Sequence, residues 1–178
     1  MPLQPAAEQD LPAIVALVNS AYRGETSRQG WTTEADYLAG QRTDLETLTR
    51  DLAVQPQAAL MVWRDDPEAP ILGTVWLEPA EPGVWYLGML TVRPDLQARR
   101  LGRTLLHAAE AFAERRGARR IRMTVVNIRD TLIAWYARRG YDPTGETRPF
   151  PYGDQRFGQP LRDDLEFVVL EKALPPST

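Results

Sequence analysis

The chain has 178 residues, of which 43% are hydrophobic and 25% are charged, and its formal net charge is −3. This length and composition predict one soluble globular domain with a sizeable core, and the sequence pI of about 5.3 argues against general nucleic-acid binding. Cysteine is absent, which excludes disulfides and thiolate catalysis. The sequence contains no run of about eighteen apolar residues, so no membrane span is predicted.

The residue inventory leaves several other chemistries without support. The single histidine, His107, gives a transition metal no ligand set, so no metal is expected. None of the serines lies in a nucleophile elbow, and neither a Walker A sequence nor a Gly-x-Gly-x-x-Gly motif after a strand is present. The N-terminal residues lack the basic start and apolar run of a signal peptide, and the absence of cysteine is compatible with a reducing compartment, so a cytoplasmic protein is expected.

Hydrophobic periodicity and turn residues predict the elements in chain order. Asp10 is expected to cap the first helix, Thr33 with Asp36 resembles a capping box for a second, and Asp44 is expected to cap a third. We expect helices at 11–23, 33–41, 45–53, 101–116 and 130–139, and strands at 3–6, 58–64, 71–78, 84–93, 120–126, 141–147 and 164–170. This order indicates a mixed α/β single domain over residues 1–174, followed by a tail at 175–178.

The segment from Trp85 to Phe112 carries the strongest functional signal. It reads as a buried strand, a polar turn and an amphipathic helix. A tight turn of this kind leaves backbone N–H groups at the helix start able to bind an anion such as phosphate. Arg99, Arg100 and Arg103 add positive charge at this corner. An ordinary strand-to-helix connection with solvated arginines is the alternative.

The same segment resembles the acetyl-CoA-binding core of the GNAT superfamily of N-acetyltransferases. In that family a central strand runs into Val-x-Pro, then Gln/Arg-x-x-Gly-x-Gly/Ala and a helix. This chain has Val92-Arg93-Pro94 followed by Gln97-Ala98-Arg99-Arg100-Leu101-Gly102. Arg100 replaces the first family glycine, and a positive φ there would be strained. The resemblance covers most of the chain and implies a mostly antiparallel central sheet, splayed between two central strands and flanked by helices, with acetyl-CoA entering at the splay.

The resemblance also implies roles for individual residues. The second half of the family pattern Asn-x-x-Ala-x-x-Leu-Tyr-x-x-x-Gly-Phe matches the stretch from Trp135 to Tyr141. Tyr136 would then protonate the departing thiolate, unless its ring only anchors the helix in the core. The family asparagine falls on Arg129, and the nearest asparagine, Asn127, could bind the cofactor or cap a strand end. The implied cofactor-binding set is Leu90, Thr91, Val92, Gln97, Ala98, Arg99, Arg100, Leu101, Gly102, Arg103, Asn127, Arg129 and Tyr136.

Several residues are candidates for the general base. In some family members a glutamate on the central strand deprotonates the amine through water, and Tyr86 stands at that position here. A phenol is a weak base at neutral pH, so Glu78 is the substitute, placed by the expected hairpin diagonally from Tyr86 on one face. Glu34 and Glu166 are further alternatives, and Glu78 could equally be a surface carboxylate at a strand end.

The acceptor site would be framed, by the same resemblance, by the first two helices, their loop and the last hairpin. The long connection at 148–164 is typical of a lid or binding loop. Acidic residues near the last strand would favour a cationic amine, unless they are a solvated run; these are Asp154, Asp163, Asp164 and Glu166. The candidate acceptor-binding residues are Tyr22, Arg23, Trp31, Glu34, Tyr152 and Phe157.

The sequence is therefore interpreted as an N-acetyltransferase that moves acetyl from acetyl-CoA to a primary amine by direct attack in a ternary complex. The alternatives are a non-catalytic acyl-CoA-binding sensor, a transferase of a longer acyl group, and a scaffold protein without a cofactor. Acetyl-CoA and an amine are the expected partners, the resemblance allows a homodimer, and neither nucleic acid nor membrane is expected. The sequence does not identify the acceptor, which could be a polyamine or antibiotic amine, an amino acid, or a protein N-terminus or lysine.

Overall fold

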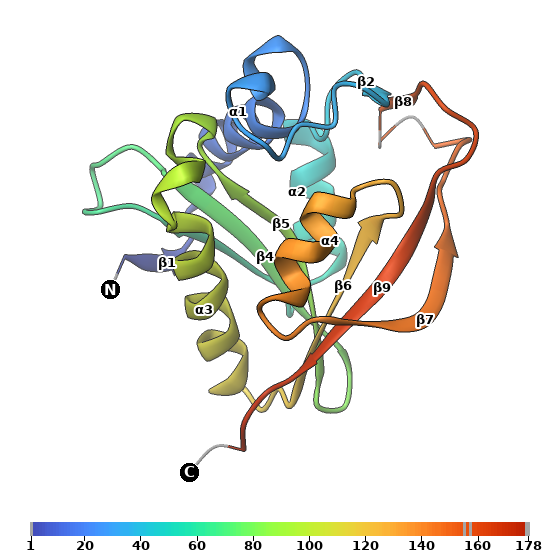
Figure 1. Ribbon diagram of the computed structural model, residues 1–178. Coiled ribbons are helices and arrows are strands. Elements are labelled where there is room, and N and C mark those ends of the chain that lie inside the picture. The colour runs from blue at the N-terminus through green and yellow to red at the C-terminus, as the bar shows by residue number, and fades with distance from the viewer. Residues whose placement is uncertain (1, 155, 157, 177–178) are drawn as a thin grey trace.

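The computed structural model describes residues 2–154, 156 and 158–176 (Figure 1). Its helices are α1 (Leu11–Tyr22), α2 (Leu45–Val54), α3 (Leu101–Glu114) and α4 (Asp130–Ala137), with 3-10 turns η1 (Glu8–Asp10), η2 (Glu25–Gln29) and η3 (Pro94–Arg99). Its strands are β1 (Leu3–Pro5), β2 (Leu38–Ala39), β3 (Ala59–Trp63), β4 (Gly73–Glu81), β5 (Val84–Val92), β6 (Arg120–Val126), β7 (Asp142–Pro149), β8 (Gln159–Pro160) and β9 (Glu166–Ala173).

A central sheet with the strand order β1-β3-β4-β5-β6-β9-β7 organises the domain. Its neighbouring strands are antiparallel except β5 and β6, which are parallel. The β5–β6 pairing runs only from Val84 opposite Arg120 to Tyr86 opposite Arg122, and no register is formed beyond it. The predicted mixed α/β fold, with a mostly antiparallel sheet splayed between two central strands, is confirmed.

Helices cover both faces of this sheet (Figure 1). On β4, Val75 and Leu77 belong to a core shared with α3, whereas Trp76 between them packs with α1 and α2. A strand buried on both faces requires this alternation, because successive side chains point to opposite faces. Tyr136 of α4 belongs to the same core as α3, so α3 and α4 lie together on one side of the sheet.

A β-bulge interrupts β5 after its short contact with β6. Between Gly88 and Thr91, β5 has one residue more than the facing part of β4. Met89 lies within this bulge with φ 51°, an uncommon value for a residue other than glycine. A bulge bends the strand that carries it, and this one lies where β5 has already lost β6 as a neighbour.

The expected second helix is wrong. Residues 33–41 form turns and strand β2, and Thr33 with Asp36 makes no capping box. Thr33 Oγ1 instead accepts a hydrogen bond from the N–H of Ala35 at 3.1 Å. Tyr37 of this segment is buried in a small core with Phe150. Packing against residues far along the chain has overridden the local helical pattern.

The predicted caps of α1 and α2 have different outcomes. Asp10 makes no side-chain cap bond to α1. Its carboxylate accepts from the N–H of Ala7 at 2.8 Å and pairs with Arg64 at 2.8 Å, which ties the start of α1 to the residue after β3. Asp44 caps α2 as predicted, by accepting from the N–H of Thr47 at 2.7 Å.

Candidate active site

Two cavities meet where β5 and β6 diverge. The first, named here the turn cavity, has a volume of about 310 Å³ and lies beside the turn that joins β5 to α3. The second, the sheet cavity, has a volume of about 640 Å³ and is lined by residues of both β5 and β6. Four residues line both cavities and are called the junction: Tyr22, Leu90, Leu132 and Tyr136.

The turn cavity is cationic. Arg100, Arg103 and Arg139 line it, and none of its lining residues in the described chain is acidic. Gly102, in the first turn of α3, also lines it, so the positive end of the helix dipole faces the cavity. Arg100 has φ 62° and ψ 7°, the left-handed conformation that favours the glycine of the family motif. Positive side chains and a helix N-terminus together suit the phosphates of a nucleotide-like ligand such as CoA.

Most of the residues implied to bind the cofactor line this cavity. Of the rest, Thr91 is buried, Leu101 packs against the main core, and Arg99 is exposed outside the cavity. Backbone binding by Thr91 does not require its side chain to line the cavity. The predicted residues that do line it are Leu90, Val92, Gln97, Ala98, Arg100, Gly102, Arg103 and Tyr136.

Asn127 and Arg129, the two alternatives for the family asparagine, are not among the residues that line the turn cavity in the described chain. Asn127 donates its amide to the carbonyl of Asp164 at 3.0 Å and accepts from the N–H of Glu166 at 3.1 Å. These bonds give it the strand-end role, because they join the end of β6 to the start of β9. Arg129 lines the sheet cavity instead.

The side chain of Gln97 fastens the loop before β2 to the turn after β5, and we call this arrangement the Gln97 clasp. Its Oε1 accepts from the N–H groups of Trp31 at 2.9 Å and Thr32 at 3.4 Å. Its Nε2 donates to Thr32 Oγ1 at 2.7 Å and to the carbonyl of Val92 at 3.2 Å. Trp31, expected in the acceptor site, consequently lines the turn cavity, 5.9 Å from the ring of Trp135.

Sequence reasoning missed the face of α4 that lines the turn cavity. Leu132 and Trp135 lie there together with Tyr136, and Arg139 lines the cavity from the turn just after α4. The guanidinium carbon of Arg139 is 3.7 Å from the ring centroid of Trp135, a cation–π contact. The signal that could have identified these residues is their spacing, since positions three and four apart on a helix share a face.

Tyr136 is buried at the junction, with 6% of its surface exposed. Its ring packs edge-on against those of Trp135 and Tyr141, at centroid distances of 5.0 and 5.7 Å. Burial raises the pKa of Tyr136 above that of a free phenol, so it stays protonated through the neutral range. Burial also raises the pKa of Tyr22, whose hydroxyl donates to the carbonyl of Leu90. The junction therefore holds protonated phenols next to the bulged strand.

Glu78 and Tyr86, the base candidates, line the sheet cavity. They stand directly opposite each other in the β4–β5 register, not diagonally as expected, because a bulge in β4 between Pro79 and Glu81 shifts the pairing. Tyr86 lies four residues before Leu90, and its ring leans along β5 in that direction, since a Cβ at Gly88 would lie 3.5 Å from the Tyr86 hydroxyl.

Each of the two base candidates makes a side-chain polar contact. Glu78 accepts a hydrogen bond from Trp76 Nε1 at 3.1 Å. The hydroxyl of Tyr86 lies 3.3 Å from Thr124 Oγ1, which belongs to β6 on the other side of the splay. Both contacts leave the remaining lone pairs of these side chains able to bind water.

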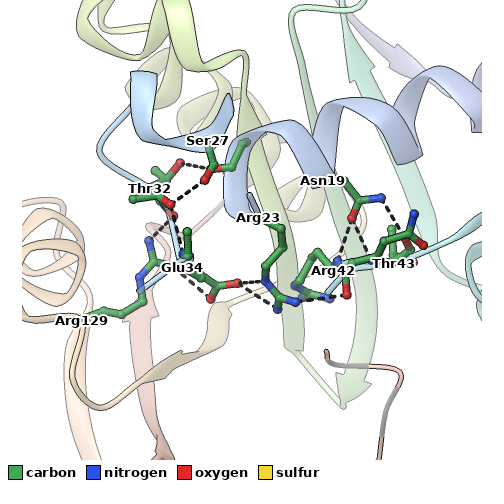
Figure 2. Close-up of polar contacts among 12 residues, drawn as sticks. Asn19, Arg23, Ser27, Thr32, Glu34, Arg42, Thr43 and Arg129 are labelled. Atoms are coloured by element: carbon green, nitrogen blue, oxygen red, sulfur yellow. Dashed lines mark hydrogen bonds and ion pairs between the residues drawn. The ribbon is translucent and has the colours of Figure 1, made fainter. Parts of the chain in front are cut away.

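Glu34 lies between two arginines in the wall of the sheet cavity (Figure 2). Its carboxylate is 3.2 Å from Arg23 Nη2 and 3.6 Å from Arg129 Nη1, and each of the three side chains is at most 9% exposed. Arg129 also donates to the carbonyl of Thr32 at 2.7 Å. Glu34, an acceptor and base candidate, is therefore engaged by two guanidinium groups.

The acidic residues near the last strand do not form a negative wall. Asp154 pairs with Arg156, and Asp164 pairs with Arg162 at 2.6 Å. Of the four acidic residues in question, Asp154 lines the sheet cavity, and the others are exposed outside its described lining. The exposure of Asp163, Asp164 and Glu166 fits the alternative, a solvated run, whereas Asp154 borders the cavity in a pair with Arg156.

The remaining acceptor candidates are set apart from both cavities or lie outside the described residues. Tyr152 is 42% exposed, and its hydroxyl accepts from the N–H of Leu165 at 2.8 Å. Phe157 falls outside the described residues.

In the described chain, no helix is long and apolar enough to cross a membrane, and no group of three His, Asp or Glu side chains could hold a metal ion.

Comparison with known families decides the classification. The model of the acetyltransferase (GNAT) family matches residues 16–141, more than half of the chain. The chain belongs to the GNAT acetyltransferase family. The matched part of this GNAT protein contains all four junction residues, whereas the loop at 148–164 lies beyond it. No curated protein sequence matches the chain.

Solved structures share the fold of this GNAT domain. A ribosomal-protein-alanine N-acetyltransferase from Brucella melitensis aligns with TM-score 0.67 and 21% identity over 98% of this chain and 100% of that one. The ribosomal-protein-S18-alanine N-acetyltransferase from Escherichia coli aligns with TM-score 0.69 and 15% identity over 99% and 95%. A GNAT acetyltransferase from Elizabethkingia anophelis with acetyl-CoA bound aligns with TM-score 0.60 and 16% identity over 74% and 86%. At these identities the likeness establishes the fold alone.

Proposed function

We propose that this GNAT protein transfers an acetyl group from acetyl-CoA to a primary amine by direct attack in a ternary complex. The observation that carries the proposal is the junction, where a cationic cavity and a second, larger cavity share two buried tyrosines, Tyr22 and Tyr136. Two substrates, one in each cavity, would meet there in a geometry that needs no covalent enzyme intermediate.

The acetyl donor would lie in the turn cavity. Arg100, Arg103 and the N-terminus of α3 would meet its phosphates, and backbone groups of the bulged part of β5 would face its thioester. Family membership supports acetyl-CoA as the donor, as does the similar structure from E. anophelis, which has acetyl-CoA bound. The acceptor amine would enter from the sheet cavity.

The reaction needs one proton removed and one supplied. The neutral amine attacks the thioester carbonyl carbon, the carbon–sulfur bond breaks, and the sulfur leaves with the bonding electrons. Tyr136 would then donate its hydroxyl proton to that sulfur, and its raised pKa keeps the proton in place until the charge develops. Glu78 or Tyr86 would take the proton of the amine through water in the sheet cavity.

Thiol release from acetyl-CoA in the presence of a panel of amines tests this proposal. With an accepted amine, Tyr136→Phe should lower kcat by about 100-fold, because general acid catalysis is removed, and should change the affinity for acetyl-CoA less than about threefold. Tyr141→Phe is the matched control, since it removes a hydroxyl from a neighbouring buried ring that lines neither cavity.

Three outcomes would contradict the proposal. Equal losses in kcat and acetyl-CoA affinity would make Tyr136 a packing or binding residue. Saturable acetyl-CoA binding without thiol release on any amine would support the sensor alternative. Preference for a larger acyl-CoA in a donor competition would support the transferase of a longer acyl group.

A further inference from the structure

The wall of the sheet cavity next to α1 carries more positive than negative charge. Arg23, Glu34, Arg42 and Arg129 all line this part of the cavity (Figure 2). Glu34 is the carboxylate partner of both Arg23 and Arg129, so two buried guanidinium groups share one carboxylate. We call these four residues the arginine wall.

Arg42 adds to this excess. Its backbone N–H is bonded to Asn19 Oδ1 at 2.7 Å, but its guanidinium pairs with no carboxylate in the described part of the chain. It lies beside Arg23: burial is the main cause that lowers the pKa of Arg23, and the charge of Arg42 adds to it against the opposing effect of Glu34. Partly desolvated like charges are costly without a counter-ion, so the arginine wall is suited to receive an anion.

The charge excess is local to the arginine wall. The other arginines that line the sheet cavity, Arg122, Arg148 and Arg156, each pair with carboxylates of their own. Arg122, for example, lies 2.8 Å from a carboxylate oxygen of Glu81 and 2.8 Å from one of Glu171. An anionic ligand would therefore be directed to one end of the cavity.

That end adjoins the junction. The guanidinium carbon of Arg129 is 5.9 Å from the ring centroid of Tyr22. The hydroxyl of the same ring donates to the carbonyl of Leu90, and both Tyr22 and Leu90 are junction residues. Arg129 therefore lies next to a residue of the junction, so a ligand that reaches both the arginine wall and the junction needs its amine and its anionic group only a few bonds apart.

We propose that the acceptor is a small zwitterionic amine of the amino-acid type, whose carboxylate binds the arginine wall while its amine reaches the junction. The inference rests on the proposed acetyltransferase function and narrows its substrate class. Arg42 and Arg129, which both line the cavity, would donate charge-assisted hydrogen bonds to the carboxylate. A polyamine has no carboxylate for the wall, and a protein N-terminus has none near its amine.

A matched set of acceptors tests the proposal. Thiol release from acetyl-CoA is measured with free α-amino acids, the corresponding α-amino-acid amides and the decarboxylated amines. We expect kcat/KM for the free acids to exceed that for the amides and decarboxylated amines by about tenfold or more, the effect of losing one charged contact. If the amides or the decarboxylated amines react with a kcat/KM equal to or higher than that of the free acids, the proposal is overturned.

Arg42→Gln tests whether the wall is responsible. The side chain of Arg42 makes no hydrogen bond in the described chain, so the variant should fold, which its thermal unfolding will verify. It should raise KM for the free acids about tenfold with little change in kcat, and leave the amides unaffected. Arg50→Gln, on the exposed side of α2, is the control. Equal effects of Arg42→Gln on acids and amides would contradict the assignment.

Failure of the acceptor proposal and failure of the acetyltransferase proposal are distinguishable. Calorimetric titration of the CoA-loaded protein with a free amino acid and its amide reports anion binding without turnover. If amides or peptides give a kcat/KM for thiol release as high as that of the free acids, the proposed acceptor class is wrong, but acetyl transfer itself still stands. Absence of thiol release with every amine would overturn acetyl transfer, and the calorimetric preference for acid over amide would then decide whether the wall binds carboxylates.

Discussion

Releasing the Gln97 clasp should weaken the fold and acetyl-CoA binding together. The clasp consists of four hydrogen bonds from one carboxamide, and a neutral hydrogen bond contributes about 0.5–1.5 kcal/mol net. Some of the released groups can turn to water, so Gln97→Ala should lower the free energy of unfolding by about 2 kcal/mol. For a domain of this size that corresponds to a Tm lower by about 4–8 °C.

A second substitution reaches the same clasp from the other side. A Cβ at Gly30 would lie 2.2 Å from Gln97 Oε1, so Gly30→Ala must displace the carboxamide and break the same bonds. Each single variant should therefore lose about 2 kcal/mol, and the double variant should lose little more than either single one, because the two changes remove one shared interaction. Acetyl-CoA should bind about tenfold more weakly to all three, since Trp31 leaves its place on the turn cavity.

Urea unfolding followed by tryptophan fluorescence, with acetyl-CoA titration of each variant, measures this cycle. Stability losses that add to about 4 kcal/mol in the double variant would refute the shared clasp. A Gly30→Ala variant as stable as the original chain would refute it as well.

Three further predictions concern the cofactor turn and the surroundings of the catalytic candidate. Gly102→Asp should weaken acetyl-CoA binding about tenfold or more by bringing a negative charge to the phosphates, whereas Gly102→Ala should bind normally, because its Cβ would meet neighbours only at 3.6 Å or more. Because burial raises the pKa of Tyr136, the pH profile of kcat should have no descending limb below about pH 10; a limb near pH 8 would contradict its role as the acid. Tyr141→Phe should cost about 1–2 kcal/mol in thermal or urea unfolding, since it removes the 2.7 Å bond to buried Glu110 but leaves the pairing of Glu110 with Lys172. An unchanged stability would mean that the Tyr141–Glu110 bond contributes nothing.

Local sequence patterns predicted most of the elements. The strand at 120–126 has the predicted bounds, and the helix that starts at Leu101 follows the predicted turn. The predicted helix at 33–41 failed because Tyr37 and Leu38 are buried against residues more than a hundred positions away, including Phe150 and Leu165. Hydrophobic periodicity and helix-capping residues depend only on the segment itself, so they cannot reveal contacts with residues far along the chain.

The cofactor turn was more predictable than the acceptor side. The turn is a short motif in which backbone groups and nearby side chains act together, so the sequence placed Gly102 and its neighbours in one cavity. The position of Trp31 depends on its hydrogen bond to Gln97, which lies 66 residues further along the chain. The position of Arg129 depends on its bond to Thr32, 97 residues away. Neither contact can be predicted from the residues next to Trp31 or Arg129 in the sequence.

Calorimetric titration of the purified protein with acetyl-CoA decides whether the turn cavity binds the acetyl donor. We expect saturable binding to one site per chain, because the turn cavity combines three arginines with the N-terminus of α3. We also expect that Gly102→Asp weakens this binding and that Gly102→Ala does not. Absence of binding to the original chain would mean that the turn with Arg100 in place of glycine does not hold the donor, and would contradict acetyl transfer at this junction.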